Sequence, residues 1–413
     1  MPNPTRPGHA IAFFPRLFAS TALVGAVFAF SASSATAAQT QTQTKSSAGF
    51  YHPGVLVNRA QLDLVKQKIA QGKEPWKSAY EATKASLLAS LDTAPAPRET
   101  VECGPYSKPD LGCKDEQRDS AAAYTHALLW YLSGDRAHAE KAVAIMNAWS
   151  STLTGGHTNS NGPVQAAWCG EQFPRAAEII RYTYDGWPAA DVERFKKMLA
   201  TQYVPILLKG SCENGNKELS MSAALINIGV FNDDREIFDS GVKMWRGRTP
   251  AYIYLSKDGA QPLKAAGCDD MPIWGNKGKT TPFVDGLLQE SVRDSNHANL
   301  GLSSMVNAAE TARQQGLDLY AEQGDRICAA LEFQAQFLKP NDAPPVSNVV
   351  MNVHPTWEIA FNHYHNRLGK PLPKMAAVLP TIRPTGWNHQ MAWETLTHAE
   401  VKDAGLPPVI TAP

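Results

Sequence analysis

The chain has 413 residues, of which 43% are hydrophobic and 19% are charged, a balance typical of a globular protein with a sizeable core. It carries 39 basic and 39 acidic side chains, so its formal net charge is zero. This excludes a broad basic surface for nucleic acid, and an acidic ligand would need a local cluster of positive groups.

The N-terminal segment has the pattern of a secretory signal peptide. Arg6 and Arg16 precede an apolar run, and residues 35–37 ("ATA") offer a small-residue cleavage site. The run is short for a membrane-spanning helix. We therefore expect a signal peptide over residues 1–37 and a flexible leader over 38–48. The mature protein is expected to be secreted or periplasmic, with no membrane attachment after cleavage.

Most of the remaining chain has the pattern of amphipathic helices joined by short turns. Residues 120–153 predict a helical hairpin around "SGD", and residues 217–245 predict a second pair of helices. In that pair, Asp233 and Glu236 resemble a capping box. No linker divides the chain after residue 50. We expect a single all-α domain over residues 49–405, built as a toroid of paired helices.

Six cysteines follow the predicted signal peptide, and an exported protein can form disulfides. Cys103 and Cys113 flank a Gly/Pro-rich loop, so we expect this pair to be bonded. The spacing matches no zinc signature, and six cysteines allow fifteen connectivities, so the other pairs stay open.

Three segments concentrate polar and aromatic side chains at predicted helices. Trp168, Gln172 and Arg175 have helical spacing and would form one face, either as a sugar-binding platform or as a core Trp beside a surface Arg. Asn214 and Asn216 precede a helix, where they would either cap it or bind a carboxylate.

The third segment is "RDSNHANLGL", residues 293–302. Arg293 and His297 are four residues apart and share a helix face. Gly301 and Ser304 continue that face with small side chains, which leaves room for another group to approach. The alternative interpretation is a capped helix start with a satisfied histidine.

The C-terminal region adds four polar or aromatic candidates, namely His363, Tyr364, Arg383 and His389. The "HYH" at 363–365 places alternate residues on different helix faces, so we expect no metal site. Walker, GxGxxG, HExxH and GxSxG motifs are absent from the sequence. Glycoside hydrolysis needs two placed carboxylates. It stays open because the sequence offers several candidates, namely Glu171, Glu218, Glu290, Asp294 and Glu358.

The blocks "NGNKELSMSAALINIGVFNDDREIFDSG", "RDSNHANLGL", "NAAETARQQGLDLY" and "PTWEIAFNHYHNRLG" resemble the alginate-lyase-domain polysaccharide lyases. The resemblance covers about residues 50–400 and is strongest to polysaccharide lyase family 38, which includes glucuronan and alginate lyases. It implies an incomplete (α/α) toroid with an open substrate cleft, and β-elimination of an acidic polysaccharide. Better-known alginate lyases of this fold carry an Asn-His pair where this chain has "NGNKEL". The histidine role is therefore expected to pass to His297.

β-Elimination removes the C5 proton of a 1,4-linked uronate and expels oxygen 4. The neighbouring carboxylate must be neutralised first, a role we assign to Asn216 with Arg293. Arg293 would also lower the pKa of a nearby tyrosine. We assign proton transfer to Tyr364 and name His297 as base or partner. The seven other residues are expected to bind substrate, namely Trp168, Gln172, Arg175, Asn214, His363, Arg383 and His389. No cofactor or metal is required.

The expected activity is a secreted lyase acting on β-1,4-glucuronan or on alginate rich in poly-mannuronate. D-Mannuronate and D-glucuronate share their configuration at C4 and C5 and differ at C2. The catalytic residues therefore cannot separate the two polymers, and residues near C2 must do so. A glycoside hydrolase on the same kind of toroid is the main alternative, and a uronan-binding protein without catalysis is a weaker one.

Overall fold

Helices dominate this computed structural model, which describes residues 45–344, 346–351, 357–402 and 404–409. All of these residues belong to one compact unit, Thr42–Pro413. The α-helices are α1 (Arg59–Ala70), α2 (Trp76–Ala85), α3 (Cys113–Ser133), α4 (Arg136–Thr152), α5 (Gly162–Thr183), α6 (Ala189–Met198), α7 (Val204–Leu207), α8 (Gly215–Asn232), α9 (Arg235–Tyr252), α10 (Ser295–Gln314), α11 (Leu319–Ala335), α12 (Glu358–Phe361), α13 (Pro373–Ile382) and α14 (Glu394–His398).

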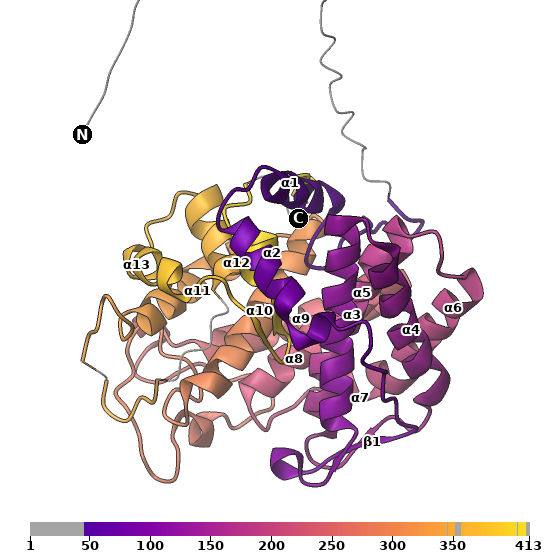
Figure 1. The fold of residues 1–413 in the computed structure, drawn as a ribbon. Coiled ribbons are helices and arrows are strands. Elements are labelled where there is room, and N and C mark those ends of the chain that lie inside the picture. Colours follow the sequence, from indigo (N-terminus) through magenta and orange to yellow (C-terminus); the bar gives the residue numbers. More distant parts are fainter. Residues whose placement is uncertain (1–44, 345, 352–356, 403, 410–413) are drawn as a thin grey trace, which may run out of the picture. The chain divides into compact units, whose positions relative to one another are not determined.

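The helices form an inner and an outer layer. Helices α3, α5, α8 and α10 pack successively on one another, while α4 and α9 pack against the outside of α3 and α8 (Figure 1). The inner helices are buried on all sides: α8 from Leu219 to Phe231 and α10 from Ala298 to Ala312. Helix α4 instead buries one stripe of residues. This confirms the all-α class and the α/α toroid of paired helices.

The core lies between these two layers and is built around large aromatic side chains. Trp149 of α4 and Trp245 of α9 are fully buried, and each indole N–H has a partner. The Trp149 indole donates to Asp119, and the Trp245 indole donates to the Met305 carbonyl. Truncating such a side chain to alanine typically costs about 3–5 kcal/mol of stability, so the two layers are held firmly together.

Side-chain caps fix where α1, α4, α8, α9, α10 and α11 begin. Asn58 accepts a hydrogen bond from the Gln61 amide at 2.8 Å, and Asp318 does the same for α11. The predicted capping box at Asp233 is wrong by one residue. Asp233 ends α8 in a left-handed conformation, with φ +58°, and Asp234 is the residue that caps α9.

Strands are short, with two or three residues each. They are β1 (Val101–Cys103), β2 (Asp110–Leu111), β3 (His157–Thr158), β4 (Trp387–Asn388) and β5 (Met391–Ala392). Strand β1 pairs antiparallel with β2 and parallel with β3, and β4 pairs antiparallel with β5. The Cys103–Cys113 disulfide is present as predicted, and a second one joins Cys212 to Cys268.

The N-terminal boundary of the domain differs from the prediction. Residues 45–48, expected to be part of a flexible leader, form a turn in which Lys45 pairs with Tyr51. Arg235 of α9 donates to the Ala48 carbonyl at 3.1 Å. The domain therefore begins earlier than residue 49. The predicted signal peptide and the leader up to residue 44 lie outside the described residues.

Candidate active site

A groove of about 630 Å³ opens where the inner helices begin. Its walls come from the first turns of α3, α5, α8 and α10, from the loop of the Cys103–Cys113 disulfide, and from the β4–β5 hairpin. Helix N-termini carry partial positive charge and attract anions. Among the described lining residues, Lys114, Lys217 and Arg293 are cationic and only Glu213 is acidic. The groove therefore favours a negatively charged ligand.

The start of α8 contributes one predicted residue as a cap and another as a polar group at the groove. Asn214 is the N-cap, because its side chain accepts from the Lys217 amide at 2.8 Å. Gly215 allows the chain to pass close to Tyr252, since a Cβ there would lie 2.3 Å from the ring. Asn216 lines the groove, and its amide nitrogen donates to Glu290 at 2.8 Å.

The start of α10 places a histidine in the same groove. Asp294 caps the helix by accepting from the His297 backbone amide at 2.8 Å, and its carboxylate also lies 2.8 Å from His297 Nδ1. Because a carboxylate only accepts, Nδ1 carries a proton, and in the neutral form of the ring the free lone pair is on Nε2. The His297 side chain is 28% exposed, so Nε2 chemistry is accessible from the groove.

The carboxylate of Asp294 is held in its ionised form. Partial burial acts to raise its pKa, but hydrogen bonds from the His297 side chain and backbone outweigh burial and lower the pKa below its usual value. The aspartate thus stays charged and keeps the imidazole in one tautomer and one orientation. The small residues that follow on this helix face do not leave open space, because Tyr252 fills the position beside Gly301.

Glu290 links the two predicted carboxylate-binding residues. It accepts from Asn216 and, at 3.0 Å, from Arg293 Nη1. Burial raises the pKa of Glu290, while the Asn216 hydrogen bond and the Arg293 charge oppose that rise. Glu290 also has a φ of +70°, a strained conformation for this residue type. Glu290 thus holds both the Asn216 amide and the Arg293 guanidinium in place at the groove.

Trp168 and His389 form another part of the groove wall. Their rings meet edge to face, with centroids 4.4 Å apart. His389 occupies the turn of the β4–β5 hairpin with φ +51°, and its Nδ1 lies 2.6 Å from the Asn388 side-chain oxygen. Both predicted substrate-binding residues are therefore in the groove.

Gln172 and Arg175 do not reach the groove, which corrects the prediction of a three-residue sugar platform. Both are buried, and they hold the β4–β5 hairpin instead. Gln172 donates to the His389 carbonyl, and Arg175 donates to the Gln390 carbonyl, each at 2.7 Å. Helical spacing correctly placed them one and two turns after Trp168, but these turns lie deeper in the toroid.

Tyr364 and His363 lie in the core, which corrects the assignment of proton transfer to Tyr364. The Tyr364 hydroxyl donates to the Tyr320 carbonyl at 3.0 Å, and burial raises its pKa well above the usual value. A phenol with a raised pKa does not act as a base near neutral pH. His363 stacks on Tyr320 with centroids 4.0 Å apart, and burial lowers its pKa to about 4.

Arg383 lines a different cavity, of about 440 Å³, beside α1, α2, α12 and α13. Its guanidinium pairs with the buried carboxylate of Glu358, with Nε and Oε2 2.8 Å apart. None of the residues that line this cavity in the described chain also lines the groove. The prediction that Arg383 binds substrate is therefore not supported by its position.

Several groove residues had no place in the sequence interpretation. Lys217 follows Asn216, and its ammonium pairs with Glu213. Lys114 and Gln117 follow Cys113 at the start of α3, and Tyr106 is 83% exposed on the disulfide loop. The signal that could have found Lys114 and Gln117 is their place in the first turns of an inner helix, the same place that Asn216 and His297 occupy.

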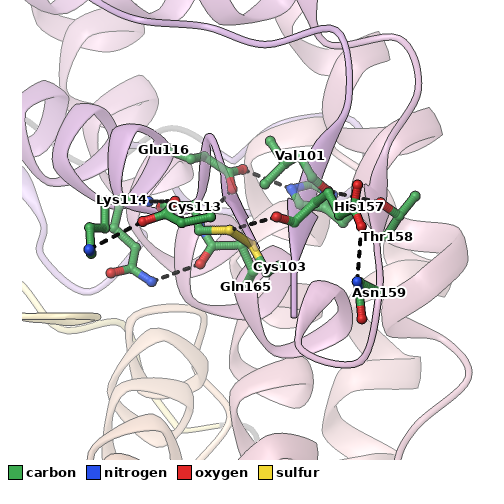
Figure 2. The surroundings of a disulfide bond; sticks show 12 residues. Val101, Cys103, Cys113, Lys114, Glu116, His157, Thr158, Asn159 and Gln165 are labelled. Atoms are coloured by element: carbon green, nitrogen blue, oxygen red, sulfur yellow. Dashed lines mark hydrogen bonds and ion pairs between the residues drawn. A yellow bond between two sulfur atoms is a disulfide. The ribbon is translucent and has the colours of Figure 1, made fainter. Parts of the chain in front are cut away.

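A buried network supports the groove wall beside this disulfide. Figure 2 shows Glu116 near Cys113, with His157 and Gln165 close by. Glu116 interacts with His157 Nε2 at 2.8 Å and accepts from Gln165 Nε2 at 2.8 Å. Strand β3, which carries His157, pairs with β1 at Val101. The wall is thus fixed by a disulfide, a strand pair and a buried carboxylate.

The carboxylates that left glycoside hydrolysis open are not arranged as a catalytic pair. Glu171 is buried against Arg175, Glu218 pairs with Arg248, and Glu358 pairs with Arg383. The remaining two, Glu290 and Asp294, are engaged with Arg293 and His297. Hydrolysis requires one carboxylic acid and one carboxylate facing the glycosidic bond, and the positions of these five residues do not favour it.

In residues 45–344, 346–351, 357–402 and 404–409, no three His, Cys, Asp or Glu side chains cluster closely enough to hold a metal ion. Over the same ranges, every helix is too short or too polar to span a bilayer.

Comparisons with known proteins identify a family and related folds. A family model described as alginate lyase matches residues 63–344. A search of curated proteins gives no match. Among solved structures, a complex of alginate lyase A1-III with a tetrasaccharide has a TM-score of 0.58 at 16% identity, covering 84% of this chain and 98% of that chain.

Two further solved structures share the fold. Alginate lyase A1-III from Sphingomonas species A1 has a TM-score of 0.55 at 16% identity, covering 82% of this chain and 94% of that chain. An alginate lyase from Bacteroides ovatus has a TM-score of 0.52 at 15% identity, covering 84% and 99%. At these identities the structural likeness establishes the toroid fold alone.

Proposed function

Because this chain belongs to the alginate lyase family, we propose that it cleaves a 1,4-linked polyuronate by β-elimination and leaves 4,5-unsaturated ends. Family membership makes the chain a polysaccharide lyase. The observation that carries the finer proposal is the groove at the inner-helix N-termini, where His297 lies beside the Asn216–Glu290–Arg293 cluster.

The chemical difficulty is the weak acidity of the C5 proton. While the adjacent carboxylate is ionised, removing the proton builds a second negative charge beside the first. Arg293 and Asn216 supply donors at the groove, and two helix N-termini add partial positive charge. Preorganised donors of this kind stabilise the enolate-like intermediate more than the ground state. We assign carboxylate neutralisation to these two residues.

His297 is the proton-transfer residue in this proposal. Its Nε2 takes the C5 proton, the electron pair of the C5–H bond forms the C4–C5 double bond, and the C4–O4 bond breaks. Oxygen 4 leaves with a proton, which the imidazolium returns. One group can do both steps because the proton and the leaving oxygen lie on the same side of the ring in mannuronate and glucuronate. Asp294 stabilises the imidazolium through Nδ1.

The substrate class is a polymer of D-mannuronate or D-glucuronate. The family model and the solved relatives are described as alginate lyases. The sequence resemblance to family 38 adds glucuronan, which stays a prediction. Both polymers present the carboxylate and the syn proton in the same geometry, so the residues above serve either one.

We also propose that the protein is exported. The N-terminal pattern of residues 1–37 supports this proposal, and so do the two disulfides, which form and persist in oxidising compartments. Fractionation of the expressing cells tests it. Mature protein lacking the first residues should appear outside the cytoplasm, and full-length protein confined to the cytoplasm would contradict export.

The function is tested by incubating the purified oxidised protein with poly-mannuronate and with glucuronan. We expect ultraviolet absorbance from conjugated unsaturated ends to rise as the chains shorten. Poly-guluronate is a useful third substrate, because inverted C5 requires anti elimination and should react more slowly. New reducing ends without absorbance would indicate hydrolysis. Tight binding with intact polymer would indicate a binding protein, and either result would overturn the proposal.

A further inference from the structure

A relay of buried groups fixes the orientation of one amide in the groove wall. Gln165 of α5 is 1% exposed, and its Nε2 donates to Glu116 Oε2 at 2.8 Å and to the Cys113 carbonyl at 2.9 Å. Both partners only accept hydrogen bonds. The Gln165 amide therefore has one permitted orientation, with its nitrogen toward Glu116 (Figure 2).

The orientation of Gln165 in turn fixes the amide of Gln117 in α3. With its nitrogen committed, Gln165 presents its oxygen, and that oxygen accepts from Gln117 Nε2 at 2.7 Å. Gln117 lines the groove and is half-buried. It thus keeps Oε1 and one N–H for a ligand. An amide that offers an acceptor beside a donor suits a sugar hydroxyl, which both donates and accepts, but its oxygen repels a carboxylate.

The position of Gln117 places it on the side of the groove that C2 of the reacting uronate would face. The inner helices follow in the order α3, α5, α8, α10, so α3 and α10 are the two ends of the arc around the groove. The carboxylate-binding residues Asn216 and Arg293 belong to the α8 and α10 end. In a pyranose ring C2 stands opposite C5. A uronate whose C5 carboxylate is held at α8 and α10 therefore turns C2 toward α3.

We propose that Gln117 binds the C2 hydroxyl of the reacting uronate and so determines the preference between poly-mannuronate and glucuronan, which differ only at that carbon. Gln165 is a positioning residue that sets the amide orientation. The inference rests on the proposed function. Because the Gln117 amide is held by Gln165, which the buried Glu116 carboxylate orients in turn, it does not rotate to suit the other epimer. The groove should therefore discriminate between the two polymers.

The experiment compares kcat/KM on poly-mannuronate and on glucuronan for wild type, Gln117→Ala and Gln117→Met. The methionine variant preserves side-chain volume and removes the amide. We expect a clear wild-type preference for one polymer. Both variants should reduce the ratio of the two kcat/KM values by about three- to tenfold, the effect of one neutral hydrogen bond. A merely structural role would lower both rates equally and leave the ratio unchanged.

Arg118→Ala is the matched control. Arg118 is the next residue of α3, pairs with Asp115 and Asp119, and is not part of the groove lining. Its loss should leave the ratio unchanged. A wild-type ratio near one, or a ratio that survives both Gln117 substitutions, would overturn the inference. If wild type produces unsaturated ends on neither polymer, the proposed function itself fails, and the two failures are thus distinguishable.

Discussion

Two histidine-bearing segments look alike in sequence and differ completely in the fold. Residues 293–302 and residues 357–368 each combine Arg, Asn and His within a few positions. The first begins an inner helix, and its Arg293 and His297 line the groove. Most of the second is buried, with the Tyr364 hydroxyl bonded to the Tyr320 carbonyl and the Arg367 guanidinium paired with Glu310.

The difference teaches that the position in the helix matters more than the polar content. His297 is three residues after an aspartate N-cap, in the turn whose amides face the groove. The polar groups of the second segment lie in a π-helical turn, Asn362–Arg367, that continues α12 within the core. There most of them bond to neighbouring parts of the core: Asn362 donates to the Val401 carbonyl, and Tyr364 donates to the Tyr320 carbonyl.

The substitution His297→Ala should have the largest effect on activity, and it tests whether the first segment is catalytic. We expect kcat on the preferred polymer to fall about 10²- to 10⁴-fold, the usual contribution of a general acid–base group. The melting temperature should change little, because His297 is partly exposed and makes few core contacts. Initial rates of absorbance increase and a thermal melt measure the two effects. A large drop in melting temperature with intact specific activity would place His297 among the structural histidines.

Glu310→Gln tests the buried segment. Glu310 is fully buried and faces Arg367 at 3.5 Å, so the variant leaves a buried guanidinium unpaired. We expect the free energy of unfolding to fall by about 3–5 kcal/mol. Denaturant titration measures it, and Glu322→Gln is the control. Glu322 pairs with Arg246 at the surface, where loss costs about 1 kcal/mol or less. Equal effects of the two substitutions would contradict the account.

Tyr364→Phe should have a smaller effect. The variant keeps the ring and loses the hydrogen bond to the Tyr320 carbonyl, which typically stabilises by about 1 kcal/mol. The kcat should stay within about twofold of wild type, because the hydroxyl does not reach the groove and the substitution removes one neutral contact. A loss of activity comparable to that of His297→Ala, with stability intact, would restore Tyr364 as a proton-transfer residue.

Two buried histidines, His363 and His52, should make the stability of the protein depend on pH in opposite directions. The pKa of His363 is lowered to about 4 by burial, so its contribution to stability is present at neutral pH and is lost as pH falls below about 6.5. Burial also acts to lower the pKa of His52, but Glu178 and then Asp233 outweigh it and raise that pKa.

The stabilisation from His52 is therefore fully present below about pH 6.5 and disappears as pH rises through the raised folded-state pKa. Denaturant titrations of wild type and His52→Phe at several pH values measure this contribution. The stability gap should narrow from about pH 6 to about pH 9. A gap that widens over that range would show that the carboxylates do not hold the proton on His52.

Much of the fold could be predicted from local patterns. The hairpin over 120–153 was marked by apolar periodicity around "SGD", and the α8 and α10 starts by the polar clusters at residues 214–216 and 293–297. The Cys103–Cys113 pair followed from its loop. These features depend on neighbouring residues alone, so the sequence contains the necessary information. The groove residues at those two helix starts were found for the same reason.

The remaining assignments depended on tertiary packing. Gln172 shares a helix face with Trp168, but the β4–β5 hairpin, more than two hundred residues later, covers it. Tyr364 has no local feature that shows it will be enclosed by α11. Gln117 is inconspicuous until Gln165 and Glu116 orient it. Spacing gives the face of a helix, whereas the identity of the neighbour comes only from the assembled toroid.

The most direct test of the central claim, elimination at the inner-helix groove, is a mass balance on a defined oligouronate. The two fragments from each cleavage are weighed by mass spectrometry and compared with the parent. Elimination adds no water, so the fragment masses should sum to the parent mass. The double bond should be found on the fragment that carries the new non-reducing end. Fragments that together exceed the parent by one water would show hydrolysis and contradict the account.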